Sequence, residues 1–143
     1  TEHFTDGLAT VADGLVYAVH SEGPRITANQ PADLRAYDLA TGKEVWKHSF
    51  PYPANSQPAV AFLGKGTGLS DRLAVVIPIG AQPLPDSTNL MARDYESGIV
   101  ALDAKTGDLI WQYNMPMWPY AMVAGDFQRL MHATLCLPNP YGS

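Results

Sequence analysis

Short runs of apolar and β-prone residues, separated by Gly, Pro and Asp, follow one another along most of this chain. The run Gly14–His20 follows an Asp-Gly pair, and Leu73–Ile77 is almost continuously apolar, which is typical of a strand buried on both faces. Two further runs, Leu8–Ala12 and Gln57–Phe62, precede them. Gly and Pro number 12 each, so the pattern predicts many turns, short strands and no long helix.

One sequence pattern occurs twice. The segments Leu34–Trp46 and Ile99–Trp111 can be aligned without a gap, and Ala, Asp, Thr, Gly and Trp recur in the same register. The repeated positions are Ala36, Asp38, Thr41, Gly42 and Trp46 in the first copy and Ala101, Asp103, Thr106, Gly107 and Trp111 in the second. Internal self-similarity of this kind is the signature of a repeat architecture.

Each copy of the pattern predicts a β-hairpin. A first strand leads into the Thr-Gly turn, where glycine tolerates the positive φ of a tight turn and the preceding Asp accepts hydrogen bonds from turn amides. A second strand follows and carries the tryptophan, whose large ring can cover a neighbouring sheet. The predicted strands are Leu34–Tyr37 and Glu44–Phe50 in the first hairpin and Ile99–Leu102 and Leu109–Asn114 in the second.

Together with the preceding runs, each hairpin makes a unit of about four antiparallel strands, as in one propeller blade. We therefore divide the chain into a blade at 1–53, a blade at 54–118 and the start of a truncated blade at 119–143. The two tryptophans lie 65 positions apart (46 to 111), more than the usual blade repeat of about 40–50 residues. A Pro-rich inserted loop at 78–98 accounts for the excess, and a smaller insertion, 22–33, occupies the same place in the first blade.

The A-x-D-x-x-T-G-x-x-x-W stretch resembles the repeat of the quinoprotein alcohol dehydrogenase-like (PQQ-like repeat) superfamily. The resemblance implies an all-β fold: a β-propeller of four-stranded antiparallel blades with tryptophan docking. Such propellers close with about seven or eight blades. About two and a half blades are present here, so we expect a fragment of a larger propeller.

The resemblance leaves three functions open. The first is a protein-binding scaffold or subunit of a larger assembly, the second is part of a PQQ-dependent dehydrogenase oxidising alcohols or sugars, and the third is a structural repeat protein without a small ligand. The dehydrogenases of the family use calcium and often an adjacent Cys-Cys pair, whereas this sequence contains only Cys136. We assign no catalytic or metal-binding residue, and we expect PQQ with calcium only if the full chain is a dehydrogenase.

Several residues could carry chemistry, but each has a simpler interpretation. Asp38 and Asp103 could act as bases, although their repeated placement favours turn capping. The Gly64–Gly68 stretch lacks the spacing of a phosphate-binding loop, and no two histidines have the H-x-x-x-H spacing typical of a metal site. The remaining candidates are His3, His20, His48 and His132, the loop carboxylates Asp86, Asp94 and Glu96, and the segment Met115–Tyr120. This last segment could line a pocket or a protein interface, but it fits blade packing better.

The charge pattern limits the classes of partner that we expect for this chain. The formal net charge is −5 and the nine basic residues are scattered, so no surface for nucleic acid or anionic lipid is indicated. No apolar run approaches the roughly 18 residues of a membrane span. We expect the partners to be the remaining blades of the same chain or other protein subunits. The family resemblance alone favours a secreted, periplasmic or organelle-lumen location.

Overall fold

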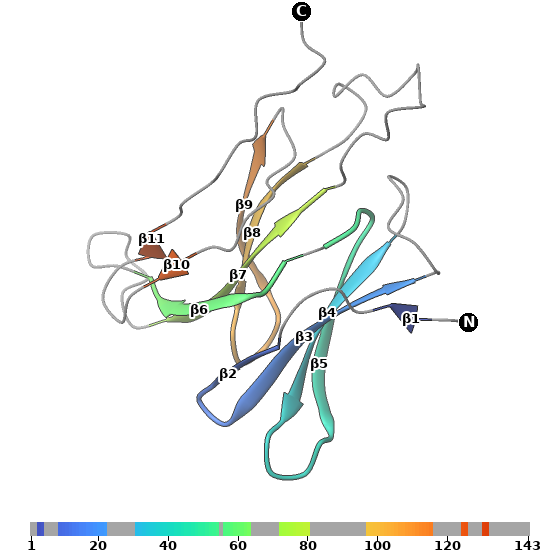
Figure 1. The fold of residues 1–143 in the computed structure, drawn as a ribbon. Helices are drawn as coiled ribbons and strands as arrows, with labels where there is room; N and C mark the ends of the chain where they lie inside the picture. The colour runs from blue at the N-terminus through green and yellow to red at the C-terminus, as the bar shows by residue number, and fades with distance from the viewer. Residues whose placement is uncertain are drawn as a thin grey trace, which may run out of the picture.

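The computed structural model describes a part of the chain that includes both repeat hairpins. The described residues are 3–4, 9–22, 31–54, 56–63, 72–80, 97–115, 124–125 and 130–131. In these residues all regular structure is β, and the strands form two large antiparallel sheets and one small hairpin (Figure 1). The predicted all-β fold of four-stranded blades is therefore confirmed.

The first sheet is built from five strands, in which β3 (Leu15–Glu22), β4 (Ala32–Asp38) and β5 (Glu44–Phe50) pair in chain order. On the other side of β3 lie two short strands, β1 (His3–Phe4) at one end and β2 (Thr10–Ala12) at the other. Asp13 and Gly14 join β2 to β3 with φ angles of 47° and 76°. Positive φ at both positions is what an Asp-Gly pair favours in a tight hairpin turn.

The second sheet repeats this arrangement with four strands in chain order. They are β6 (Ala59–Phe62), β7 (Leu73–Ile79), β8 (Ser97–Asp103) and β9 (Leu109–Met115). The first strands of the two sheets, β2 and β6, contact each other, and a short hairpin of β10 (Ala124–Gly125) and β11 (Leu130–Met131) lies against β6. Thus β10 stands beside β6 as β6 stands beside β2, which is the order of first strands in successive blades.

The main hydrophobic core lies between the two sheets. One face of the first sheet supplies Tyr17, Leu34, Ala36 and Trp46, and the facing side of the second sheet supplies Val75, Ile77, Val100 and Leu102. Because side chains alternate between the two faces of a strand, the apolar run of β7 also buries Val76 in a second cluster on its far side. Strand β7 is therefore buried on both faces, as its apolar composition predicted.

The two repeat turns have the same backbone geometry. Gly42 and Gly107 adopt φ angles of 69° and 75°, and the N–H of each donates to the carbonyl of the repeat aspartate, at 2.8 Å in both turns. Each hairpin also carries a β-bulge after the repeat alanine, where Val45 or Ile110 is the extra residue. The repeated sequence thus encodes a repeated turn and bulge, which increase the local twist of the hairpin.

The predicted loop boundaries at 78–98 need correction. Strand β7 continues through Pro78 to Ile79, and β8 begins at Ser97, so both strands extend into the predicted loop. Proline normally ends a ladder because it has no N–H to donate. Here β6 begins at Ala59, opposite Val76, so the missing N–H of Pro78 lies beyond that ladder, and the N–H of Gly80 on the same side of the strand donates to the Pro53 carbonyl.

The first strands and the smaller insertion also differ from the prediction. Strands β2 and β6 begin two residues later than the runs at 8–12 and 57–62, whereas β3 and β4 extend into the predicted insertion 22–33. Residues 81–96 lie outside the described residues, as does most of the third predicted unit, 119–143.

Candidate functional site

Within each sheet, residues that pair across neighbouring strands form rows. Corresponding rows of the two sheets define equivalent positions. Tyr17 pairs with Ala36, which pairs with Trp46, and the corresponding row of the second sheet is Val76, Ala101 and Trp111. The next row on the same face is Val19, Leu34 and His48, which corresponds to Pro78, Ile99 and Tyr113. We call this side of each sheet its docking face.

The docking face of the first sheet is covered by the repeat turn of the second. The Trp46 indole Nε1 donates to the Ala104 carbonyl at 3.0 Å, and the Tyr17 hydroxyl donates to the same oxygen at 3.1 Å. The two rings are tilted by 48° with centroids 6.0 Å apart, and only 8% of Trp46 is exposed. Burial, together with Asp13 and Asp103, raises the pKa of Tyr17 to about 12, so its hydroxyl remains a donor at neutral pH.

The rest of the turn also contacts the docking face. A Cβ built on Gly107 would stand 2.7 Å from Cε3 of Trp46, so the absence of a side chain lets the indole lie directly on the turn. His48 Nδ1 is 3.0 Å from the Gly107 carbonyl, and its ring packs on Phe50. His48 is therefore a packed residue between the sheets. Tyr17, His48 and Ala104 were not predicted for this site, because their roles depend on the neighbouring blade.

The docking face of the second sheet is more open in the part of the chain that the structure describes. Trp111 is partly buried against Val76, Ile99 and Ala101, and 64% of Tyr113 is exposed. The equivalent residues of the first sheet, Trp46 and His48, both bond to a turn of the next blade. The two tryptophans of the repeat therefore have different surroundings. Because Val76, Ala101 and Ile99 are buried, the open part of this face lies along β9 at Trp111 and Tyr113, and it is the candidate interaction site.

The repeat aspartates hold the turns. Asp38 Oδ1 accepts hydrogen bonds from the Thr41 hydroxyl at 2.7 Å and the Thr41 N–H at 2.8 Å, which together hold the pKa of this carboxyl below its usual value. For Asp103, burial raises the pKa, but the N–H groups of Lys105 and Thr106 and the Arg72 guanidinium outweigh it, so the net shift is downward. Both groups are bonded as turn caps.

The lowered pKa of Asp103 predicts acid sensitivity. A carboxylate whose pKa is depressed by folding contributes stability above its unfolded pKa of about 3.9 and loses it as the pH falls through the folded value. The midpoint of urea unfolding is therefore expected to fall as the pH drops below about 4. The variant Asp103→Asn should have a lower midpoint at pH 7 and a weaker decline in acid. An unchanged pH profile in this variant would show that Asp103 is not responsible.

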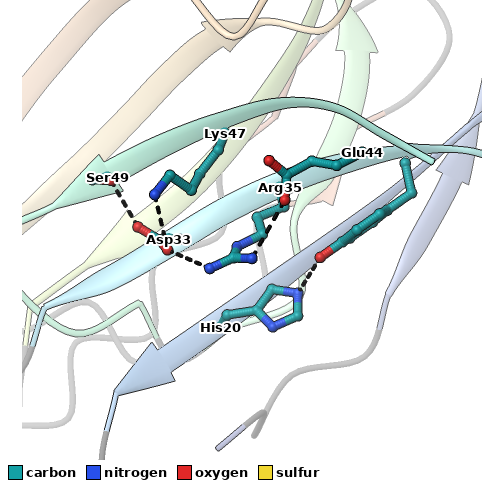
Figure 2. A network of polar contacts seen from close by, with 7 residues as sticks. His20, Asp33, Arg35, Glu44, Lys47 and Ser49 are labelled. Carbon is teal, nitrogen blue, oxygen red and sulfur yellow. Dashed lines mark hydrogen bonds and ion pairs between the residues drawn. The ribbon is translucent and has the colours of Figure 1, made fainter. Parts of the chain in front are cut away.

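The outer face of the first sheet, turned away from the second sheet, carries a polar network (Figure 2). Asp33 accepts hydrogen bonds from Arg35 at 2.8 Å and from the Ser49 hydroxyl at 2.7 Å, and Lys47 lies 3.9 Å away. Burial raises the pKa of Asp33, but these partners outweigh it and hold the pKa below its usual value. The same hydrogen bond to Asp33 raises the pKa of Arg35, whose second partner is Glu44 at 3.3 Å.

Most other sequence candidates lie outside the described residues, or have only their backbone described. This applies to Gly64–Gly68, to the carboxylates at 86, 94 and 96, to His132 and Cys136, to the side chain of His3, and to the segment Met115–Tyr120 beyond Met115. His20 is bonded to the Tyr37 hydroxyl at 2.9 Å. Within the described ranges, no three His, Cys, Asp or Glu side chains are grouped to hold a metal ion. We derive no catalytic step from these residues.

The same described part contains no helix that is long and apolar enough to cross a membrane.

The structure contains two antiparallel blades. Trp46 of the first blade bonds to the repeat turn of the second, and the first strands of the two blades contact each other. This arrangement defines a partial β-propeller of PQQ-like repeats. The family model described as outer membrane protein assembly factor BamB matches residues 2–142, so the chain belongs to this family. No curated protein matches the chain.

Proposed function

We propose that this propeller segment is a protein-binding scaffold within a larger assembly, and that the docking face of the second sheet is where it is joined. The observation that carries the proposal is the exposure of Tyr113, which is 64%, at the position where the first sheet has His48, a half-buried residue 3.0 Å from the Gly107 carbonyl of the next blade. Exposed aromatic side chains such as Tyr113 are favoured in protein interfaces.

The covered docking face indicates the chemistry of the partner. At Trp46 the occupant is a β-turn that offers a backbone carbonyl to the indole N–H and a glycine under the ring. We propose that Trp111 accepts a turn of the same kind, from a further blade of the same polypeptide or from another subunit. The family description concerns outer-membrane protein assembly, which supports a scaffold and, within the same proposal, a location outside the cytoplasm.

Site-specific cross-linking tests this proposal in the native assembly. A photoreactive phenylalanine analogue replaces Tyr113 in one variant and Leu109 in the other. Leu109 is the matched control because it is 54% exposed on the same strand, β9, but pairs with Leu102, whose side chain belongs to the opposite face. We expect efficient cross-linking from position 113 to a glycine-containing turn and little from position 109. Equal yields at the two positions, or none at 113, would contradict the proposal.

The intact mass of the native polypeptide separates the two sources of the partner. A mass several times the 15.5 kDa of this sequence, with an intramolecular cross-link at position 113, would assign the turn to a further blade of the same chain. A cross-link to a different polypeptide would assign it to another subunit.

A further inference from the structure

The contact between the two sheets shows which positions a neighbouring blade buries. On the face of the second sheet against which the first sheet packs, Ile77 and Val100 form the middle of one row and are 0% and 1% exposed. Gln112 belongs to the same row but stands on the last strand, β9, and it remains exposed. A neighbouring blade therefore covers the two central strands of this face and leaves the side chain on the last strand in water.

On the outer face of the first sheet, the equivalent row is Ala18, Arg35 and Lys47. Arg35 thus stands where the second sheet has the buried Val100. Each blade of a propeller packs between two neighbours, so we expect a blade to cover this face as the first sheet covers the second. That blade would bury the guanidinium of Arg35 and leave Lys47 in water. The side chains of Arg35 and Asp33 are already only 25% and 15% exposed.

Arg35 has more donors than partners among the residues that the structure describes. One of its nitrogens donates to Asp33 at 2.8 Å and another to Glu44 at 3.3 Å (Figure 2). Its Nε is buried and has no acceptor in the described part of the chain. A blade that covers Arg35 removes water from the remaining N–H groups, and a buried donor without an acceptor is costly. The covering blade is therefore expected to supply an acceptor.

The docking face of the first sheet, which covers the second sheet, presents the opposite chemistry. Its central positions are apolar, at Leu34 and Ala36, and its polar groups at Tyr17 and Trp46 donate to the Ala104 carbonyl. Such a face would leave an arginine beneath it without a partner. The blade that covers the first sheet is therefore expected to carry a different docking face.

The charge of the network limits the acceptor. Arg35 and Asp33 form an ion pair in which the two charges balance, so a further carboxylate would bury a net negative charge at a high cost in desolvation. Backbone carbonyls of a central strand are already used in the sheet ladder. The acceptor that fits is an uncharged side-chain oxygen, from an amide or a hydroxyl group.

We propose that Arg35 determines which blade stacks on the first sheet, by requiring a docking face that places an amide or hydroxyl side-chain oxygen against its guanidinium. Hydrogen bonds across this contact run in the opposite direction from those at Trp46, where the docking face donates. A docking face without the oxygen is disfavoured because it leaves a buried donor unpaired. The two contacts of the first sheet are then not interchangeable, which fixes the order of its neighbours. The inference does not rest on the scaffold proposal, because it concerns the opposite face.

A crystal structure of the intact native polypeptide in its assembly tests the proposal without a variant. We expect an amide or hydroxyl oxygen of the neighbouring blade at about 2.7–3.2 Å from a nitrogen of Arg35. A guanidinium that meets only water, carbon atoms or a carboxylate of that blade would overturn the proposal. If position 113 fails to cross-link while this oxygen is found, the scaffold proposal fails and the role of Arg35 stands; the reverse pair of results separates them equally.

A pair of variants measures the contact in the same native polypeptide. Asp33→Asn/Arg35→Met removes both charges of the ion pair and keeps similar side-chain volumes, a change that is often close to neutral when the pair has no other partner. We expect an unfolding constant about tenfold larger or more, because the neighbour's oxygen loses its donor. Lys47→Met is the matched control on the same face and should change the constant by less than about twofold. Equal unfolding constants for the double variant and the wild type would refute a partner for Arg35.

Discussion

Replacement of Trp46 by alanine is expected to lower the free energy of unfolding by about 3–5 kcal/mol, the usual cost of truncating a large buried aromatic residue. The variant loses the packing of the indole on Tyr17 and the repeat turn, and it loses the bond from Nε1 to the Ala104 carbonyl. Urea unfolding followed by far-ultraviolet circular dichroism measures the loss without relying on tryptophan fluorescence.

Trp111→Ala is the matched control, because Trp111 occupies the same repeat position on the next sheet. It is less buried than Trp46, so its replacement should cost clearly less in the separate chain. In the native assembly, we expect Trp111→Ala to weaken the contact with the partner, since truncation of central interface aromatics commonly costs about 2 kcal/mol or more. Equal losses for the two variants in the separate chain would contradict the difference in docking.

Gly107→Ala is expected to be the second most damaging of the changes considered, with a loss of about 3 kcal/mol, and Gly42→Ala is its matched control. Both glycines have positive φ, at 75° and 69°, so each alanine carries a similar backbone penalty of about 1–2 kcal/mol. The added Cβ meets the Trp46 ring at 2.7 Å at position 107 and no atom within 4 Å at position 42. The excess loss at Gly107 therefore measures the clash with the indole.

A double variant isolates this contact. If the indole causes the excess loss, Gly107→Ala should cost much less in the Trp46→Ala background than in the wild type, because the side chain that it meets has been removed. Chemical denaturation of the wild type, the two single variants and the double variant gives the interaction free energy directly. Strict additivity would mean that the cost at Gly107 comes from the backbone alone.

Much of the fold could be predicted from local sequence patterns. The strand Glu44–Phe50 has the predicted bounds, and both Thr-Gly turns follow from the need for positive φ and for a carboxylate acceptor. Such features depend on residues close together in the chain. Pro78 was misassigned to the loop because its tolerance depends on where the neighbouring strand β6 begins, which no local pattern contains.

The sequence by itself determined the repeat, its two hairpins and the positions of its tryptophans. Only the tertiary structure decided that Trp46 is covered and Tyr113 exposed, because that difference depends on which blade lies against each face. The same holds for Ala104, whose carbonyl accepts from Tyr17 and Trp46 across sequence separations of 87 and 58 residues. Local patterns specify turns and strands through neighbouring backbone groups, whereas a docking site is made by groups from different blades that meet only after folding.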